Sequence, residues 1–218
     1  MSDNKKYLKK ITISNYSSRN AAFYDDPMNK NFVYGELTID FVNKIELKKT
    51  DKIIADIGCG TAFAFDIIYE KLKKNKTKCI GIEPAKGMLT LAKNKFKSDD
   101  DFSFYEGTFG KIPLKDKSVD KIISTLALHW VPSMIDSIKE LKRILKTNGT
   151  IDILMIDKND GESFKLPVIE AMKKHLTFKQ IMKAASLAQR VSSKHIYDYF
   201  NMEFDLINKY TLTVQNVK

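Results

Sequence analysis

The chain has 218 residues, of which 43% are hydrophobic and 29% are charged, and its net charge is +10. This length and composition suit one soluble globular domain with a sizeable core and an appended lobe. No apolar run approaches the ~20 residues of a membrane helix, and no apolar stretch follows the lysine-rich N-terminus, so we expect a cytoplasmic protein that does not cross a membrane. Cys59 and Cys79 lie in unrelated settings, which predicts two reduced thiols and neither a disulfide nor a metal site.

The positive charge raises the question of a nucleic-acid partner. Only Arg19, Arg143 and Arg190 are arginine among the 37 basic residues. Recognition of phosphates and bases favours the arginine fork over lysine. The lysines are scattered along the solvent faces of predicted helices, and scattered charge gives only weak, sequence-independent attraction. We therefore do not expect nucleic acid as the partner, and an RNA acceptor is kept as an alternative.

Residues 1–30, at the start of the chain, are predicted to form an N-terminal cap. This segment is polar with scattered aromatic residues, among them Tyr16 and Tyr24, and a short helix is expected over residues 19–24, before Asp26-Pro27. Apolar residues then recur at every fourth position, which predicts one face of an amphipathic helix. These residues are Val33, Leu37, Phe41 and Ile45.

Five apolar segments predict buried strands. They are residues 53–57, 78–83, 102–106, 119–125 and 150–157. Helical patterns follow the first, second and fourth strands, and no hairpin signal occurs between them. This alternation predicts an α/β fold with a doubly wound, mostly parallel sheet and helices on both of its faces.

The helices between the strands have clear boundaries in the sequence. Phe63, Ile67, Ile68 and Leu72 mark the first of them. Pro84 opens the second, in the first turn, where proline is tolerated. The third extends from Met134 to about Leu145 and is expected to stop at Asn148-Gly149.

Beyond residue 158 the pattern changes to three helical segments, at residues 163–176, 177–190 and 192–200. Residues 204–217 alternate in polarity as a strand does. Within a single domain we predict three parts after the cap: a cofactor-binding core at 31–157, a helical insertion or acceptor lid at 158–203, and a return strand at the sheet edge at 204–218.

Conspicuous polar and glycine residues lie at the predicted strand ends. They are Asp56, Gly58, Cys59, Gly60, Glu83, Thr108, Phe109 and Ser124. In a doubly wound sheet, ligands bind outside the carboxyl ends of the strands, at the point where the strand order reverses. We therefore expect these residues to converge on one crevice.

Glu83 indicates the class of ligand. It lies about twenty residues after the glycine turn, at the end of the adjacent strand, where a carboxylate can accept hydrogen bonds from both hydroxyls of a ribose. The structural alternative is an acid favoured by the dipole of the following helix. The glycine turn lacks the third glycine of a dinucleotide-binding motif, because Phe63 occupies that position, and it lacks the Gly-Lys-Ser/Thr of a phosphate cradle. The predicted ligand is a nucleoside without a pyrophosphate.

Four segments, in this order and spacing, resemble class I S-adenosylmethionine-dependent methyltransferases of the small-molecule type. They are DIGCGTA, IEPAKGML, EGTFGKIPLKDKSVDKIISTLALHW and LKRILKTNG, within residues 30–157. The resemblance implies a Rossmann-like methyltransferase fold with S-adenosyl-L-methionine as cofactor. It also implies an enzyme that moves a methyl group by in-line displacement.

The resemblance also implies roles for individual residues. Gly58 and Gly60 approach the methionine part of the cofactor, with Asp56 beneath it, and Glu83 binds the ribose. The adenine is bordered by Pro84, Ala85 and Met88, and its edge is read at Thr108 and Phe109. Tyr16 and Tyr24 resemble positions in an N-terminal lid over the cofactor, the alternative being packing residues of the cap. Two residues depart from the family pattern: Ala62 replaces a third glycine, and Thr108 replaces an aspartate that usually bonds the adenine amino group.

The acceptor is indicated by the loop LALHWVPS, which is similar to that of malonyl-acyl carrier protein methyltransferases. This resemblance implies a small-molecule or carrier-bound acceptor with a nucleophilic oxygen or nitrogen. A hydroxyl or amine acceptor benefits from a base, and His129 is the candidate, the alternative being a histidine that orients its loop. Two other functions stay open: an RNA or protein methyltransferase, and a non-catalytic scaffold that binds the cofactor.

Members of this family usually add a sixth strand and an antiparallel seventh, whereas one strand-like segment precedes Lys218 here. We expect a shortened member, a sheet completed by a partner chain, or a sequence that ends early. An open sheet edge would favour association into oligomers.

Overall fold

The computed structural model describes residues 21, 24–26, 33–158, 160, 162–181 and 192–205. Its centre is a five-stranded sheet in the order β3-β2-β1-β4-β5, with every neighbouring pair parallel. The strands are β1 (Ile53–Ile57), β2 (Lys78–Glu83), β3 (Phe102–Glu106), β4 (Val119–Thr125) and β5 (Leu145–Leu154). The order reverses between β1 and β4, which confirms the predicted doubly wound α/β fold.

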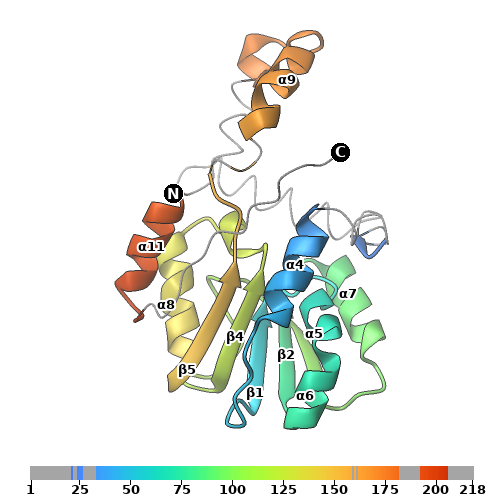
Figure 1. The fold of residues 1–218 in the computed structure, drawn as a ribbon, viewed down its shortest axis with the longest axis vertical. Helices are drawn as coiled ribbons and strands as arrows, with labels where there is room; N and C mark the ends of the chain where they lie inside the picture. Colours follow the sequence, from blue (N-terminus) through green and yellow to red (C-terminus); the bar gives the residue numbers. More distant parts are fainter. Residues whose placement is uncertain are drawn as a thin grey trace.

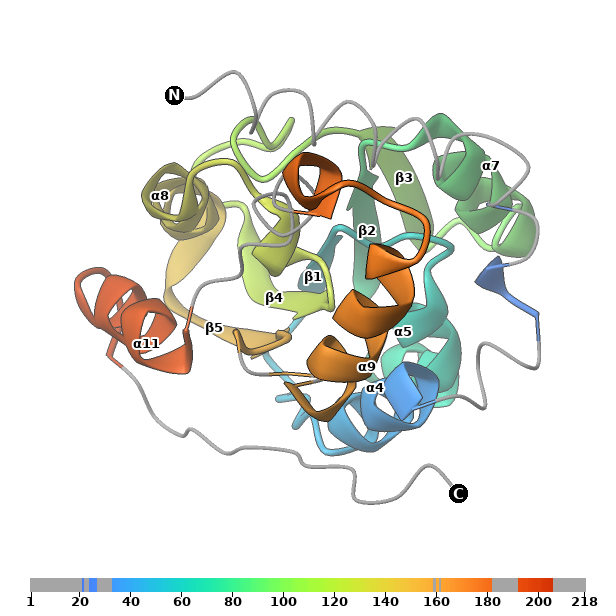
Figure 2. The same ribbon diagram turned by 90° about the horizontal axis from the view of Figure 1, so that it is seen from above.

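Two layers of helices cover the two faces of the sheet (Figures 1 and 2). One layer consists of α4 (Val33–Asn43), α5 (Phe63–Ile67), α6 (Tyr69–Asn75) and α7 (Lys86–Lys95), and the other of α8 (Met134–Ile144) and α11 (Ser193–Asn201). Side chains of β1 alternate between the layers, with Ile54 in the first core and Ala55 and Ile57 in the second. Burial on both faces explains why this strand is apolar almost throughout.

The first four strands have the predicted bounds, and α4 and α7 lie where their patterns predict them. The helix predicted after β1 is instead divided into α5 and α6. Ile68 separates them, with φ −104° and ψ 19°, outside the helical range. The apolar spacing continues across the break, since Ile68 and Leu72 are both buried in the first core, so periodicity alone could not reveal it.

The start of β5 corrects the sequence-based prediction. The helix α8 ends at Ile144, and β5 begins at the next residue rather than at residue 150. The strand ends at Leu154 rather than at residue 157. Leu145 pairs with Val119, and an irregularity in the register follows between Val119 and Lys121. Gly149 lies in this irregular part, where an added Cβ would be 2.8 Å from the carbonyl oxygen of Asp120. The glycine therefore allows close approach of two strands and does not stop a helix.

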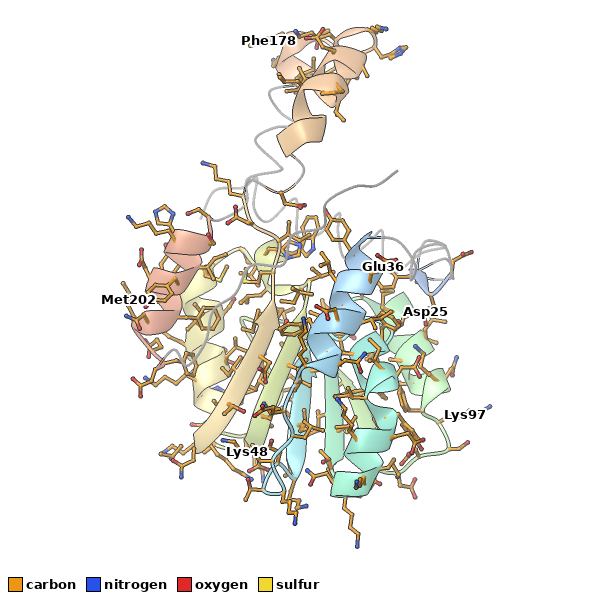
Figure 3. All side chains as sticks on the ribbon, in the orientation of Figure 1. Asp25, Glu36, Lys48, Lys97, Phe178 and Met202 are labelled. Carbon is orange, nitrogen blue, oxygen red and sulfur yellow. The ribbon has the colours of Figure 1, made fainter. Side chains whose placement is uncertain are left out.

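The helical insertion after the fifth strand is confirmed for its described residues. It contains α9 (Glu162–Lys173), a helical turn at residues 178–181, and α11. The helix α9 projects from the body, beyond the carboxyl ends of the strands, and Phe178 lies at the tip of this projection (Figures 1 and 3). Phe178 is 78% exposed and Leu166 is 73% exposed. The predicted role of this insertion as an acceptor lid stays a prediction.

Several predicted features fall wholly or partly outside the described residues. Most of the cap, Tyr16 included, residues 182–190 and the return strand beyond Asp205 belong to this group. Residues 21 and 24 are helical, as the short helix of the cap predicts. In the described part of the chain, β3 and β5 are the edge strands, and association through an edge stays a prediction. None of the described helices is long and apolar enough to span a bilayer.

Replacing Gly149 with alanine tests the corrected start of β5. We expect Gly149→Ala to lower the free energy of unfolding by about 1–3 kcal/mol, because the new methyl group would overlap the Asp120 carbonyl and the Leu145 side chain. Urea unfolding monitored by circular dichroism measures this change. The control is Gly110→Ala, where no heavy atom lies within 4 Å of an added Cβ. Equal stability of the two variants would contradict the described packing of β5.

Candidate functional site

In the glycine turn after β1, the backbone lies close to side chains of other segments. Gly58 has φ +76°, and a Cβ added there would lie 2.4 Å from the Cβ of Ala127 and 3.3 Å from the ring of Phe109. Both the left-handed conformation and the lack of space select glycine at this position. The Gly58 amide donates to the carbonyl oxygen of Ile82 at 2.8 Å, which holds the turn against β2.

Two further residues of this segment have positive φ angles. Gly60 has φ +56°, and the nearest atom to an added Cβ is the Met88 methyl carbon at 3.4 Å. Ala62 has φ +62° and is completely buried at the start of α5. This conformation costs an alanine about 1 kcal/mol relative to a right-handed one. A glycine at this position, as the family pattern implies, would avoid that cost.

Glu83 links the glycine turn to the start of α7. Its Oε2 accepts a hydrogen bond from the Gly60 amide at 3.0 Å, and its Oε1 accepts one from the Ala85 amide at 2.8 Å. Burial raises the pKa of the Glu83 carboxyl, and the two amide donors oppose that shift. A carboxylate offers about four acceptor positions, so roughly two are available to hydroxyl groups of a ligand. The structural and the ribose-binding interpretations of Glu83 are therefore compatible.

Asp56 lies beneath the turn, on the same face of β1 as Ile54. It is fully buried, and within the described residues neither carboxylate oxygen has a hydrogen-bond partner. Burial, with a smaller contribution from the charge of Glu83, raises the pKa of Asp56 to about 8. An ionised carboxyl without a partner is costly inside a protein, and a cationic ligand group nearby would offset that cost.

A cavity of about 620 Å³ lies at the carboxyl ends of the central strands. Among the predicted site residues, its wall includes Gly58, Gly60, Glu83, Pro84, Met88, Thr108 and Phe109. These residues come from the ends of three strands and from α7, as the doubly wound topology predicts. The structure therefore brings this part of the predicted site together.

Other predicted residues lie behind the wall. The Cys59 side chain faces the core, since a Cβ added to Gly81 would be 2.8 Å from its sulfur, and burial with the nearby carboxylates raises the pKa of its thiol. Ser124 donates from Oγ to the carbonyl oxygen of Ile57 at 2.8 Å, which ties β4 to the end of β1. Cys59 and Ser124, like Asp56, support the crevice from beneath.

His129 belongs to the short 3-10 helix η1 (Leu128–Trp130) that follows β4. Its ring is half-buried, and the ring centroid lies 5.0 Å from that of Trp130. Trp130 lines the cavity and is 51% exposed, whereas His129 is not part of the cavity wall. The predicted base thus lies adjacent to the site, with Trp130 as its neighbour on the wall.

The N-terminal cap contributes Tyr24 to the cavity, one of the two tyrosines that resemble lid residues in the sequence. Tyr24 lines the wall, and the next residue, Asp25, anchors this segment. Asp25 Oδ1 accepts a hydrogen bond from the buried Thr61 hydroxyl at 2.6 Å, and Asp25 Oδ2 pairs with Lys95 at 3.0 Å. The cap is therefore held to the residue directly after the glycine turn, a long-range contact that no local pattern predicts.

The start of α8 supplies wall residues that sequence analysis missed. Ser133 caps this helix, and its side chain accepts from the Asp136 amide. Asp136 and Ser137 in the first turn also line the cavity, and Lys111 does so from the connection before β4. The Ser-x-x-Asp sequence at the helix start was an available signal, because such caps place the first turn at a fixed position.

Comparisons with known proteins agree with this geometry. A family model described as "Methyltransferase domain" matches residues 55–153. Ubiquinone/menaquinone biosynthesis C-methyltransferase UbiE of Campylobacter jejuni is 32% identical over 126 residues, which cover 56% of this chain and 52% of that protein. Malonyl-[acyl-carrier protein] O-methyltransferase of Marinomonas sp. is 33% identical over 100 residues, 45% of this chain and 36% of that protein. The chain spans about half the length of the first of these relatives and less of the second.

Residues 55–153 therefore match the methyltransferase-domain family. A solved structure of a SAM-dependent methyltransferase from Thermotoga maritima, described as a possible histamine N-methyltransferase, shares the fold of this domain. Its TM-score is 0.58 at 21% identity, over 90% of this chain and 79% of that chain.

The residues of the methyltransferase domain fit the cofactor that the family implies. The turn at Gly58 offers backbone where a Cβ could not be accommodated. Glu83 has acceptor positions left for ribose hydroxyls. The unpartnered Asp56 carboxyl lies beneath the turn, where a sulfonium cation nearby would favour its ionised form.

Asp56 predicts how the stability of the methyltransferase domain depends on pH. Its pKa is about 8 in the folded protein and about 3.8 when exposed, so between these values the folded state holds a proton that the unfolded state has lost. Stability therefore falls as pH rises from about 5 to 8, by linkage. Asp56→Asn cannot ionise, and we expect its stability to change less over this range.

Urea unfolding at several pH values measures this difference. The carboxyls with lowered pKa values, such as Asp101 at about 2, titrate below the range and affect both proteins equally. Parallel pH profiles for the two proteins would show that the Asp56 carboxyl is ionised in the folded state, contrary to this prediction.

Proposed function

We propose that this protein is a methyltransferase that uses S-adenosyl-L-methionine to methylate an oxygen or nitrogen of a small-molecule or carrier-bound metabolite. The observation that carries the proposal is the position of Glu83, whose carboxylate joins the glycine turn to α7 and lines the cavity. The relative whose printed name is a malonyl-[acyl-carrier protein] O-methyltransferase supports a carrier-bound acceptor.

In this proposal Glu83 binds the ribose and the backbone at Gly58 and Gly60 lies against the methionine part. Met88 and Phe109, both largely buried, provide apolar surface for the adenine. Thr108 replaces the aspartate of the family pattern, so its hydroxyl is the polar group available to the adenine edge. When bound, S-adenosylmethionine supplies an electrophilic methyl group on a sulfonium. The contribution of the protein is to align the acceptor with that group and to exclude water.

The wall near Trp130 is the proposed place of the acceptor. Trp130, Val131 and Pro132 are apolar and line the cavity beside η1, while Lys111 and Asp136 add charge at exposed positions of the wall. A hydroxyl or amine acceptor must lose a proton as it is methylated. We propose that His129, next to Trp130, receives this proton once the acceptor is bound, since hydrogen bonds to a base often tighten only in the complex.

The proposal predicts that S-adenosylhomocysteine binds and that Glu83 determines its affinity. We expect Glu83→Gln to weaken binding by about a hundredfold or more, because hydrogen bonds to a charged acceptor contribute about 1.5–3 kcal/mol each. Isothermal titration calorimetry measures the affinities. Glu83→Gln is preferred to alanine, since the amide oxygen can still accept from one of the two backbone amides.

Glu106→Gln is the matched control for this experiment. Glu106 is the exposed neighbour of Glu83 in the register of β2 and β3, and we expect its variant to bind like the wild type. The absence of any binding heat with wild-type protein would refute the proposed function. Equal binding by the two variants would remove Glu83 from the ribose site.

The role of His129 has a separate test. We expect His129→Asn to reduce methyl transfer by about 10²–10⁴-fold, the usual contribution of a general base, without changing the affinity for S-adenosylhomocysteine. Incorporation of labelled methyl groups into a metabolite extract measures transfer. Unchanged incorporation with the variant would assign His129 to orienting its loop instead.

A further inference from the structure

The connection between β3 and β4 poses a structural problem. Residues 107–118 contain no helix, although a connection between parallel strands is usually helical. Four consecutive residues of this segment, 108–111, line the cavity. An irregular segment has no internal ladder of hydrogen bonds to fix it, so its position must be set by contacts with other elements.

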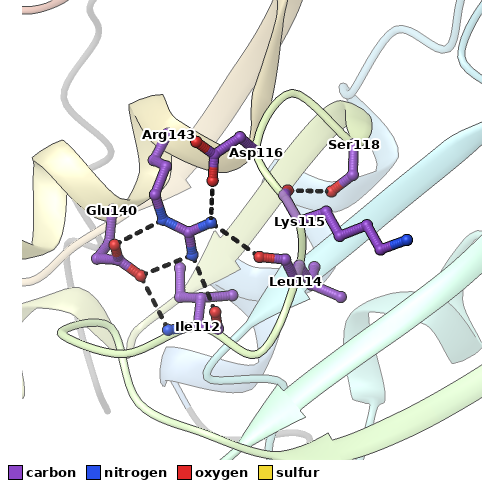
Figure 4. Close-up of polar contacts among 7 residues, drawn as sticks. All are labelled: Ile112, Leu114, Lys115, Asp116, Ser118, Glu140 and Arg143. Atoms are coloured by element: carbon purple, nitrogen blue, oxygen red, sulfur yellow. Dashed lines mark hydrogen bonds and ion pairs between the residues drawn. The ribbon is translucent and has the colours of Figure 1, made fainter.

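Arg143 and Glu140, one turn apart on α8, bind the backbone of this segment (Figure 4). Glu140 Oε2 accepts from the Ile112 amide at 3.0 Å, and Arg143 Nη2 donates to the Ile112 carbonyl oxygen at 2.9 Å. Both peptide groups of Ile112 are therefore paired by two side chains of one helix. In a sheet, a neighbouring strand would provide these two bonds.

Every N–H of the Arg143 guanidinium has an acceptor. Nη1 donates to the Leu114 carbonyl oxygen at 2.8 Å and to Asp116 at 2.7 Å. The Glu140 carboxylate accepts hydrogen bonds from Nε at 2.7 Å and from Nη2 at 2.9 Å. A lysine has three donors at one point and cannot reproduce this fork. In a chain with so few arginines, the use of one here is consistent with a need for that geometry.

The ion pair between Arg143 and Glu140 is partly shielded from solvent, so it can contribute to stability. The side chains of Arg143 and Glu140 are 29% and 23% exposed, whereas that of Asp116 is 75% exposed. The hydrogen bond from Arg143 holds the pKa of Glu140 below its usual value. The contact with Asp116 contributes little, because exposed ion pairs are weak. The anchoring therefore depends on the Glu140 pair and the two backbone carbonyls.

The anchored residue is connected directly to the cavity wall. Ile112 is buried, and it follows a turn closed by two hydrogen bonds, from the Thr108 amide to Lys111 and from the Lys111 amide to Thr108, at 3.2 and 2.9 Å. At the other end, the Gly107 amide donates to the Glu83 carbonyl oxygen at 3.4 Å. The turn thus lies between β2 on one side and the Arg143–Glu140 pair on the other.

We infer that Arg143, together with Glu140, is a positioning pair that sets the place of the 108–111 turn and thereby the affinity of the cavity for the nucleoside part of its ligand. This inference rests on the proposed function. Neither side chain lines the cavity, so the pair acts through Ile112 and the turn. The same helix lines the cavity with Asp136 and Ser137, and α8 therefore supports two parts of the wall.

The test compares Arg143→Lys, which keeps the charge but not the fork, with Lys142→Met. Lys142 is the adjacent residue of α8, and it forms an ion pair with Glu203, beyond the end of α11, at 2.8 Å. We expect Arg143→Lys to weaken binding of S-adenosylhomocysteine about tenfold and Lys142→Met to leave it unchanged, at a temperature where both are folded. Glu140→Gln loses the charge and one acceptor oxygen but leaves the two bonds from Arg143 to backbone carbonyls, so it should fall between them.

Two further readouts separate positioning from general destabilisation. The affinity for adenosine should fall by the same factor as the affinity for S-adenosylhomocysteine in Arg143→Lys. The reason is that the proposed function assigns the turn to the nucleoside and not to the methionine part. Hydrogen exchange of amides 108–112, measured without ligand, should become faster in Arg143→Lys while that of β1 stays unchanged.

Each outcome decides a different point. If wild-type protein binds no S-adenosylhomocysteine, the proposed function fails, and hydrogen exchange alone tests the anchoring. If the wild type binds and Arg143→Lys binds equally well, or if exchange at 108–112 is unaltered, the positioning role is wrong. Equal losses in Arg143→Lys and Lys142→Met would likewise overturn it, because they would indicate a general effect on α8.

Discussion

The hydrogen bonds that Glu83 accepts from the Gly60 and Ala85 amides are the constraint on which the site depends. They join the end of β1 to the start of α7 across the end of β2. The turn can take this position only because Gly58 and Gly60 adopt positive φ angles without side chains. The 108–111 turn, which also lines the cavity, is preceded by Gly107, whose amide donates to the carbonyl oxygen of Glu83. One residue thus links three of the segments that surround the cavity.

This arrangement places two carboxyl groups, Asp56 and Glu83, in a buried part of the protein. Asp56 and Glu83 both have raised pKa values, chiefly because of burial, and Asp56 has no partner for its oxygens within the described residues. Such a site is costly without a ligand and is suited to a ligand that carries positive charge and hydroxyl donors. In the proposed function, the same two carboxyls whose raised pKa values lower the stability of the fold at neutral pH interact with the sulfonium nucleoside.

Sequence reasoning succeeded where the signal is local. The bounds of β1 to β4 were predicted correctly, because apolar runs buried on both faces end abruptly in polar turns. The prediction of β5 was wrong, because Gly149 allows close contact between two strands, and the sequence does not distinguish such a glycine from one that ends a helix. The site residues at strand ends were found from topology, and Tyr24 from its resemblance to a lid residue, whereas Lys111 and Asp136 reach the cavity through tertiary contacts. Arg143 carried a usable signal, a rare arginine in a lysine-rich chain, whose partners only the structure could identify.

A crystal structure of the protein with S-adenosylhomocysteine would test the central claim most directly. We predict that both ribose hydroxyls lie within about 3 Å of the Glu83 carboxylate, with the Gly60 and Ala85 amides still bonded to it. The adenine should then contact Met88 and the turn that carries Phe109. A ligand bound elsewhere, or a ribose whose hydroxyls do not reach Glu83, would contradict the claim that this carboxylate builds the site and binds the nucleoside.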